Sequence, residues 1–563
     1  MNFNKITMFN LLVVIVGLFT NCEKVLPDNG SDNEKSLEIL IKIDPNISGN
    51  VVKNIYSDLN MWDFKSYWTT TAESMPDDFF KTKYPFVKTV QFMTATGGDV
   101  SRDLFLDPND NTILDDYNFE PLKKGLRNVI RQGLKPMIKT GAVPLKFSSS
   151  PKIGGFGVNV RPPDDYNQYY TYINALAKDL VSEFGINEVK TWSWGVLTEY
   201  ENSDWFESVN RLETKEAYFK LYDFTVAALQ DAIGASNLIV GAHSMTCNPG
   251  LWNEEEFIEH CATGVNYKTG TVGTQINFLA ASYYDQTPGV SVGVNLSLEN
   301  TIGLLKNKAN ASGLTNLRYG IDEGRILDGP DGKALGSRVV AHTFQASADA
   351  AMFKFMNNLG ADWVSNWGLN NEDVWGPVDL VGAHVANLCY KLVGKKQLDF
   401  KVEGKPINFS NIIDGMSTYD ASTKKLYVLV YNHNLNMEST SSERIKLSID
   451  KIKSSNSSVN ITEWLVDDNH GNFWPTWDED MKSQGITSDS FHWSYYSTNI
   501  AQQIKSPSDL DFWKTREGEY SELAKLKSTT KSGTIENNTL SLEFPLEHHA
   551  VVLYEIENIE LTQ

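Results

Sequence analysis

The sequence has few cysteines, a shortage of positive charge and few long apolar runs, and each of these absences excludes a class of protein. It has 4 cysteines in 563 residues, which are too few for a disulfide framework. It has 50 Lys and Arg against 71 Asp and Glu, and the formal charge of −21 argues against a nucleic-acid backbone as a partner. After residue 19 it has no apolar run long enough to span a bilayer.

Two common catalytic motifs are also missing. The chain contains no Walker phosphate-binding loop and no His-Glu-x-x-His zinc helix. Cys247, Cys261 and Cys389 are scattered and form no metal pattern, so they indicate buried free thiols, with a Cys247–Cys261 bridge as the alternative. We therefore expect neither a cofactor nor a metal.

The N-terminus indicates export. Lys5 precedes an apolar run at 8–19, and Cys22 follows it. This pattern resembles a bacterial lipoprotein signal peptide over 1–21, with Cys22 as the lipidated residue and 22–36 as a flexible tether. An acidic tether of this kind resembles an outer-surface export signal of Gram-negative lipoproteins. The alternatives are an ordinary secreted protein and an inner-membrane anchor.

Between about 51 and 395, short apolar runs alternate with amphipathic helical stretches. The runs lie at 54–63, 87–94, 135–142, 189–198, 238–244, 278–284, 317–321 and 363–367. Eight strand–helix alternations predict a (β/α)₈ TIM barrel, whose strands are covered on both faces and are therefore nearly continuously apolar.

The remainder of the chain has the pattern of an accessory β-sandwich domain. Past residue 396 the strand candidates are bounded by Asn, Ser, Gly and Asp, which is typical of an all-β domain over 396–563. An insertion with helical character is expected at about 467–530. The isolated strand candidate within 37–50 has no partner in the barrel pattern, and we expect it to join the sandwich.

Two glutamates follow apolar runs in the barrel region. Glu199 lies in TWSWGVLTEYEN (191–202) and Glu323 in LRYGIDEGR (317–325). In a (β/α)₈ barrel, residues after the strands form the active site. A pair of carboxylates there is what glycosidic bond cleavage needs, one as proton donor and one as nucleophile or base. Glu201 and Asp322 are the immediate alternatives for these roles.

Several blocks together resemble the clan A glycoside hydrolases of family thirty-nine, the β-xylosidase and α-L-iduronidase type. The blocks are GLKPMIKTGAVP (133–144), the segment 180–202, EAYFKLY (216–222), NFLAASYY (277–284), YGIDE (319–323) and WVSNW (363–367). The resemblance covers about residues 50–395. It implies that Glu199 is the acid/base and Glu323 the nucleophile, and that Thr198 occupies the position of an Asn that binds the sugar 2-hydroxyl.

Other residues are expected to contact the substrate. The resemblance makes Trp367 the platform beneath the sugar, because flat sugar faces stack on aromatic rings. Tyr284 could hydrogen-bond the nucleophile, and Tyr283 precedes it. Lys139 and His243 end the third and fifth strands. Lys139 could meet an acidic sugar, or it could form a salt bridge with a neighbouring carboxylate.

The sequence thus predicts a surface-tethered retaining glycoside hydrolase that acts on a poly- or oligosaccharide, with an exo mode suggested by the resemblance. Its expected partners are the carbohydrate and, through the lipid anchor only, the outer membrane. A catalytically silent glycan-binding barrel and an inverting enzyme are the alternatives. The sugar and the oligomeric state stay open.

Overall fold

The computed structural model describes residues 38–62, 64, 75–245, 254–284, 298–326, 343–366, 378–408, 410–434, 436, 439–455, 458–485 and 507–562. Its larger domain is a closed barrel of eight parallel strands, each paired with the next in the chain. The strands are β2 (Asp58–Met61), β3 (Thr89–Phe92), β4 (Lys135–Thr140), β5 (Ser193–Val196), β6 (Val240–Met245), β7 (Phe278–Tyr284), β8 (Arg318–Ile326) and β9 (Trp363–Asn366).

These strands confirm the barrel fold, although several of them begin or end at other residues than the sequence predicted. The fourth run was expected to begin at residue 189, but Ile186–Val189 forms the short helix α5 and the strand starts at Ser193. The seventh run was expected to end at residue 321, but β8 continues to Ile326. Glu323 therefore lies within a strand rather than past its end.

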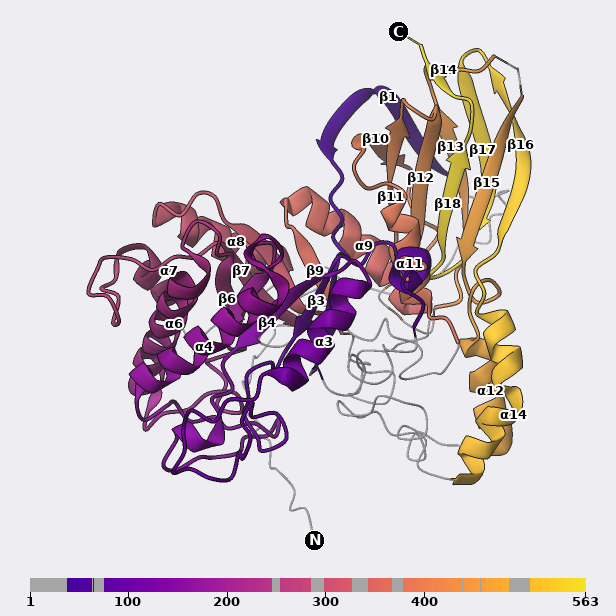
Figure 1. Ribbon diagram of the computed structural model, residues 1–563. Coiled ribbons are helices and arrows are strands. Elements are labelled where there is room, and N and C mark those ends of the chain that lie inside the picture. Colours follow the sequence, from indigo (N-terminus) through magenta and orange to yellow (C-terminus); the bar gives the residue numbers. More distant parts are fainter. Residues whose placement is uncertain are drawn as a thin grey trace, which may run out of the picture.

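Helices cover the outside of the barrel (Figure 1). They include α2 (Phe79–Lys83), α3 (Glu120–Arg131), α4 (Tyr166–Phe184), α6 (Arg211–Ile233), α7 (Glu254–Thr263), α8 (Leu298–Ala311), α9 (Thr343–Leu359) and α11 (Val381–Tyr390). Asp165 caps the start of α4 by accepting a hydrogen bond from the Asn167 amide at 2.8 Å. Gly185, at φ +78°, ends that helix in a backbone conformation that most residues avoid.

The inside of the barrel has an apolar base. Met137, Phe278, Ala280 and Trp363 pack together there. Gly320 makes room for this packing, because a Cβ atom at that position would lie 2.1 Å from the Trp363 ring. Since residues two apart on a strand face the same side, Lys139 and Ser365 lie one layer above this base, toward the carboxyl ends of the strands.

The second domain is a sandwich of nine strands joined edge to edge. They are β1 (Ile39–Val51), β10 (Lys396–Glu403), β11 (Asn411–Asp420), β12 (Lys425–Asn434), β13 (Glu443–Ile449), β15 (Ser458–Val466), β16 (Ser528–Glu536), β17 (Thr539–Leu546) and β18 (Val551–Ile556). Two short strands, β14 (Ile452–Lys453) and β19 (Glu560–Leu561), pair beside it. The N-terminal β1 pairs with β10 in antiparallel and with β13 in parallel orientation, so both ends of the described chain lie in this domain.

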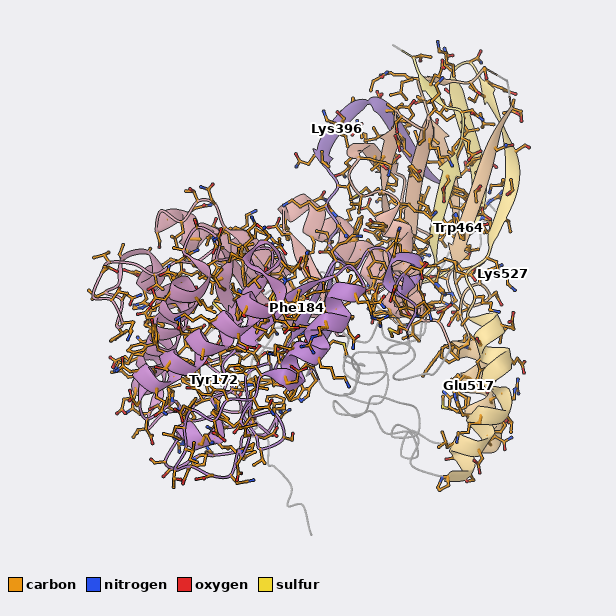
Figure 2. All side chains as sticks on the ribbon, in the orientation of Figure 1. Tyr172, Phe184, Lys396, Trp464, Glu517 and Lys527 are labelled. Carbon is orange, nitrogen blue, oxygen red and sulfur yellow. The ribbon has the colours of Figure 1, made fainter. Side chains whose placement is uncertain are left out.

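The strands of the sandwich differ in burial because one sheet faces the barrel domain. Along β13 buried and more exposed residues alternate, as expected for a strand with one solvent-exposed face. In β12 nearly every residue is buried, because one face packs in the sandwich core and the other against α9. A second contact between the domains centres on Glu555 of β18. Trp464 of β15, labelled in Figure 2, donates a hydrogen bond from its indole to this carboxylate at 2.8 Å. Lys391, just past α11, pairs with the same carboxylate at 2.7 Å.

The insertion between β15 and β16 contributes α12 (Trp474–Gln484) and α14 (Pro507–Leu523), which lie side by side at one end of the sandwich (Figure 1). Trp477 and Trp513 meet edge to face at 4.9 Å in a core that also includes Val378 and Leu380 from the segment before α11. Trp477 is completely buried. Its contact with Trp513 stabilises the two helices of the insertion against each other.

Candidate active site

Glu199 sits on a tight turn directly after β5. Leu197 and Glu199 have φ angles of +59° and +41°, a left-handed conformation that is uncommon for residues other than glycine. The Leu197 amide donates a hydrogen bond to the Thr140 carbonyl at 2.5 Å, which holds the turn against β4. Gly141 permits this approach, since a Cβ atom there would lie 2.8 Å from Leu197. Such strained backbone is concentrated at functional sites.

Glu323 faces Glu199 from β8. The register of β7 and β8 shifts on both sides of the pair formed by Ser282 and Glu323, so β8 is irregular where it carries the glutamate. Glu323 is 3% exposed. The hydroxyl of Thr198, the residue before Glu199, lies 3.5 Å from Glu323 Oε1 and donates a hydrogen bond to it. The structure therefore brings Thr198, the neighbour of Glu199, to Glu323, whereas the sequence predicted a contact of Thr198 with the sugar instead.

The environment of Glu199 favours its protonated form. Burial raises the pKa of this carboxyl from its ordinary value of 4.5 to about 8, and the negative charge of Glu323 adds to the rise. The Ser282 hydroxyl and the Asn202 amide partly oppose the shift; Asn202 Nδ2 donates to Glu199 Oε2 at 3.1 Å. At neutral pH, Glu199 can therefore donate a proton while a second carboxyl lies opposite.

The two alternative carboxyls have different surroundings. Asp322 is completely buried and points into the barrel, where its Oδ1 accepts a hydrogen bond from the indole of Trp363 at 2.7 Å. Glu201 is also buried. Burial raises the pKa of Tyr218, to which the charges of Cys261 and Glu201 add, and the Tyr218 ring stacks on Tyr200 at 3.9 Å. Asp322 thus faces the base of the barrel, whereas the charge of Glu201 acts on Tyr218 and also raises the pKa of Glu199.

A polar layer separates the glutamate pair from the apolar base. Asp58 Oδ2 accepts hydrogen bonds from Gln91 and from Ser365, the latter at 2.5 Å, and Gln91 also donates to Ser365 at 2.6 Å. Burial, followed by the charge of Asp322, raises the pKa of Asp58 to about 7. Sequence reasoning missed this layer, because a single polar residue within a short apolar run gives no sign that it points inward.

Lys139 belongs to the same layer. Its side chain is fully buried, and its Nζ has no hydrogen-bond partner among the described residues. Burial lowers the pKa of the ammonium to about 8, and the charges of Asp322, Glu323, Asp58 and Glu199 oppose that lowering. The salt bridge that the sequence offered as one alternative is absent from the described part of the chain.

The other predicted contacts are only partly described. Tyr283 is buried, with 3% exposure. The backbones of His243 and Tyr284 lie in β6 and β7, but their side chains are outside the described residues. Trp367 and the lipidation candidate Cys22 also lie outside them.

The structure adds residues near the site that the sequence did not indicate. Asn202 binds Glu199, and the Trp205 amide donates to the Asn202 carbonyl at 2.9 Å. Trp205 packs with Trp62 at 5.6 Å and stacks on Phe156 at 4.5 Å. The spacing of Asn202, three residues after Glu199 in a turn, was the available signal.

The described residues offer no evident place for a metal ion. None of their groups of His, Cys, Asp and Glu has the three or more ligands that such a site requires. Cys261 and Cys389 are buried free thiols. Among the helices described, none has both the length and the apolar character needed to cross a bilayer.

Residues 103–309, which include Glu199, match the family described as glycosyl hydrolases family 39. A β-xylosidase of Geobacillus stearothermophilus is 28% identical over 147 residues, which cover 26% of this chain and 28% of that enzyme. An α-1,4-L-rhamnosidase of Formosa agariphila is 21% identical over 305 residues, covering 53% of this chain and 56% of that enzyme. The chain therefore matches less than two thirds of the length of either relative.

The fold is similar to that of solved structures over nearly the whole chain. A GH39 enzyme from Xanthomonas axonopodis pv. citri superimposes with a TM-score of 0.65 and 13% identity, covering 94% of this chain and 99% of that chain. The predicted combination of a (β/α)₈ barrel and a β-sandwich is thereby confirmed. The resemblance to glycosidase family thirty-nine, which the sequence motifs indicated, is confirmed as well.

Proposed function

We propose that this chain is a retaining glycoside hydrolase with Glu199 as acid/base and Glu323 as nucleophile. The observation that carries the proposal is the pair of buried glutamates, Glu199 just after β5 and Glu323 within β8, in which burial and the charge of Glu323 raise the pKa of Glu199 to about 8. The match of residues 103–309 to glycosyl hydrolases family 39 supports the reaction class.

In the first half of the reaction, Glu199 donates its proton to the glycosidic oxygen while the bond from that oxygen to the anomeric carbon breaks. A carboxylate oxygen of Glu323 forms a bond to the same carbon. The leaving group departs as an alcohol, and the sugar remains as an ester of Glu323. Thr198, whose hydroxyl donates to Glu323 Oε1, orients the attacking carboxylate.

In the second half, Glu199 acts as a base because it has given up its proton. It takes a proton from water while the water oxygen bonds to the anomeric carbon, and Glu323 leaves as a carboxylate. Two displacements at one carbon retain its configuration. The reaction needs no cofactor, since both carboxyls return to their starting states.

The substrate is a carbohydrate, and its terminal sugar is the group that an exo-acting enzyme would release. The matched relatives are named for different sugars, a β-xylosidase and an α-1,4-L-rhamnosidase, so a panel of sugars is needed. Predicted contacts from Trp367, Tyr283, Tyr284 and His243 would set the choice of sugar.

The proposed place of action is the cell surface, with the protein anchored in the outer membrane by a lipid on Cys22. The apolar run at 8–19 and the cysteine that follows it support this placement. Metabolic labelling with radioactive palmitate tests it: wild type should incorporate label in the membrane fraction. Incorporation by Cys22→Ser equal to that of wild type would rule out this anchor.

The first experiment is hydrolysis of a panel of aryl glycosides by wild type, Glu199→Ala and Glu323→Ala. We expect wild type to cleave one class of sugar and Glu323→Ala to lose roughly 10⁴-fold or more of its activity. Azide should restore turnover in both variants by replacing the missing group. The anomer that forms first, followed by proton NMR, distinguishes retention from inversion.

The matched control is Glu216→Ala, which removes an exposed glutamate from α6 and should keep full activity. Equal activity of Glu323→Ala and wild type would overturn the assignment of the nucleophile. If wild type binds glycans on an array but cleaves none of them, the protein is a binding module and the proposal fails.

A further inference from the structure

The barrel interior beneath the glutamate pair holds a concentration of charge that the reaction described above does not use. Asp58 and Asp322 are buried there with 2% and 0% exposure, and Glu199 and Glu323 lie above them with 7% and 3%. Lys139, at 0% exposure, brings a positive charge into the same space. Buried charges cost free energy, so their retention at one place indicates a use.

The position of Lys139 follows from the pairing of β4. Lys139 is in register with Gly195 of β5, four residues before Glu199. Its side chain faces the same way as that of Met137, which belongs to the apolar base inside the barrel. The ammonium therefore lies between this base and the glutamate pair.

The carboxyls whose charges act on Lys139 come from different parts of the barrel. Asp58 is on β2, Asp322 and Glu323 are on β8, and Glu199 follows β5. The side chain of His243 on β6 is not among those described. Among the described groups, the charged ones other than Lys139 are carboxyls.

A second buried lysine shows how a purely structural amine is held. Lys146 follows β4, and its side chain is 1% exposed. Its Nζ pairs with Asp116 at 2.7 Å, donates to the Ile113 carbonyl at 2.7 Å and lies 4.3 Å from the centre of the Phe105 ring. Lys139 has no such direct partner within the described chain, although four carboxyls act on it.

We propose that Lys139 is a positioning residue whose ammonium keeps Glu323 anionic while Glu199 stays protonated. The inference rests on the proposed function, because these are the charge states that the first displacement needs. Lys139 acts through the carboxyls and not on the sugar, since its side chain is fully buried. This role differs from the sugar contact that the sequence suggested.

The order of the interactions explains how one cation can have different effects on the pKa values of two carboxyls. The charges that act on the ammonium decrease in effect from Asp322 to Glu323, then Asp58 and last Glu199. The proposal accordingly assigns the larger effect of the Lys139 charge to Glu323 and the smaller one to Glu199. For Glu199, burial and the charge of Glu323 dominate, and both raise its pKa.

The test is the pH dependence of kcat/KM in Lys139→Met, which keeps the length of the side chain and removes its charge. We expect the acidic limb to move to higher pH by about one to two units, and the basic limb by less. At pH values below the acidic limb, the loss in kcat/KM should be about ten- to hundredfold, which is the shift of the limb expressed as a rate ratio. Lys146→Met, the control, should lose stability but keep both limbs of the profile in place.

Two outcomes would overturn the proposal. If neither limb of the pH profile of kcat/KM moves in Lys139→Met, the lysine is a structural group like Lys146. A higher KM confined to substrates with an acidic sugar, without a change in the pH profile, would make it a substrate contact. Circular dichroism and the melting temperature of both variants establish that folded protein is compared.

A second measurement does not depend on turnover. Carboxyl carbons of the glutamates are labelled with ¹³C, and the NMR signals lost in Glu199→Gln and Glu323→Gln identify the pair. In Lys139→Met the Glu323 signal should titrate at higher pH than in wild type. If the signal shifts but no glycoside is cleaved, the proposed function fails and the charge control stands. If glycosides are cleaved and the signal does not shift, the role of Lys139 is refuted.

Discussion

The interior of the barrel and the core of the sandwich are built from opposite kinds of side chain. Above its base, the barrel buries Asp58, Gln91, Lys139 and Asp322. The sandwich core consists mostly of aliphatic residues, among them Ile39, Ile41, Leu426, Val428, Ile445, Leu447, Ile461 and Val552. Both interiors are buried, but the groups that can exchange protons are concentrated in the barrel, whereas the sandwich core is mostly aliphatic.

The difference shows what each domain can do. Burial of aliphatic side chains stabilises the sandwich in proportion to the area removed from water. Burial of carboxyls and an amine costs part of that stability, and it shifts pKa values in a way that an exposed site could not. The sandwich also packs on α9, and the Tyr56 hydroxyl of the barrel donates to the Asp349 carbonyl of this helix at 2.5 Å. The sandwich thus packs on a helix that is itself hydrogen-bonded to the barrel.

The largest expected effect comes from a change in the charged interior that hardly alters stability. Glu323→Gln should lower kcat/KM by roughly 10⁴-fold or more, because an amide cannot form the ester intermediate. Its unfolding free energy at pH 7 should stay equal or rise by up to about 1 kcal/mol, since a buried negative charge is removed. Urea unfolding measures this. A large loss of stability would mean that the carboxylate holds the barrel together.

The converse change, which lowers stability but leaves activity nearly intact, is a substitution in the sandwich core. Leu447 on β13 is fully buried, and Leu447→Ala should reduce the unfolding free energy of its domain by about 2–5 kcal/mol through lost burial and a cavity. Activity per folded molecule should remain within about twofold of wild type, because the residue lies in the separate core. A specific loss of kcat would show that the two interiors are coupled.

The charged interior should also give stability a distinctive pH dependence. A carboxyl whose folded pKa is raised contributes stability that is present below its unfolded pKa and is lost as the pH rises through the folded value. For Glu199 this window runs from about 4.5 to about 8. Over it, wild type should lose roughly 1–4 kcal/mol more than Glu199→Gln. Identical melting temperatures against pH for the two proteins would refute the shift.

At the junction of the domains, the pH dependence of stability has the opposite sign. His433 on β12 is buried, its Nδ1 lies 2.8 Å from the Ser347 hydroxyl of α9, and burial lowers its pKa from 6.5 to about 4. The unfolded chain therefore binds this proton first, and stability falls as the pH drops from about 6.5 to about 4. His433→Asn should flatten that fall by roughly 1–3 kcal/mol. An unchanged slope in acid would exclude His433 as its source.

Much of the architecture could be predicted because short-range patterns encode it. The apolar runs that became β4, β6, β7 and β9 were placed within a few residues of the observed strands. The run at 189–198 was misplaced at its start because Ile186–Val189 has apolar spacing that suits either a strand or a helical turn. The extension of β8 past residue 321 depends on pairing with β7, which no local pattern contains.

The site could be predicted only in its outline. Glu199 and Glu323 were found because each follows an apolar run, whereas Asp58, Gln91 and Ser365 carry no such signal. Their hydrogen bonds join residues far apart in the chain; Ser365 and Asp58 are 307 positions apart. The polar layer exists because the barrel closes, and closure is not a property of any one segment.

By itself the sequence determined the succession of strands and helices and the change to an all-β domain, and it singled out two glutamates that follow apolar runs of the barrel region. Hydrophobic periodicity and turn residues act over a few positions, so they can be read along the chain. Only the tertiary structure decided that the pKa of Glu199 is raised, that Thr198 reaches Glu323 across 125 positions, and that the charges of four carboxyls act on Lys139. Charge states depend on burial and on neighbours in space, and the closed barrel supplies both.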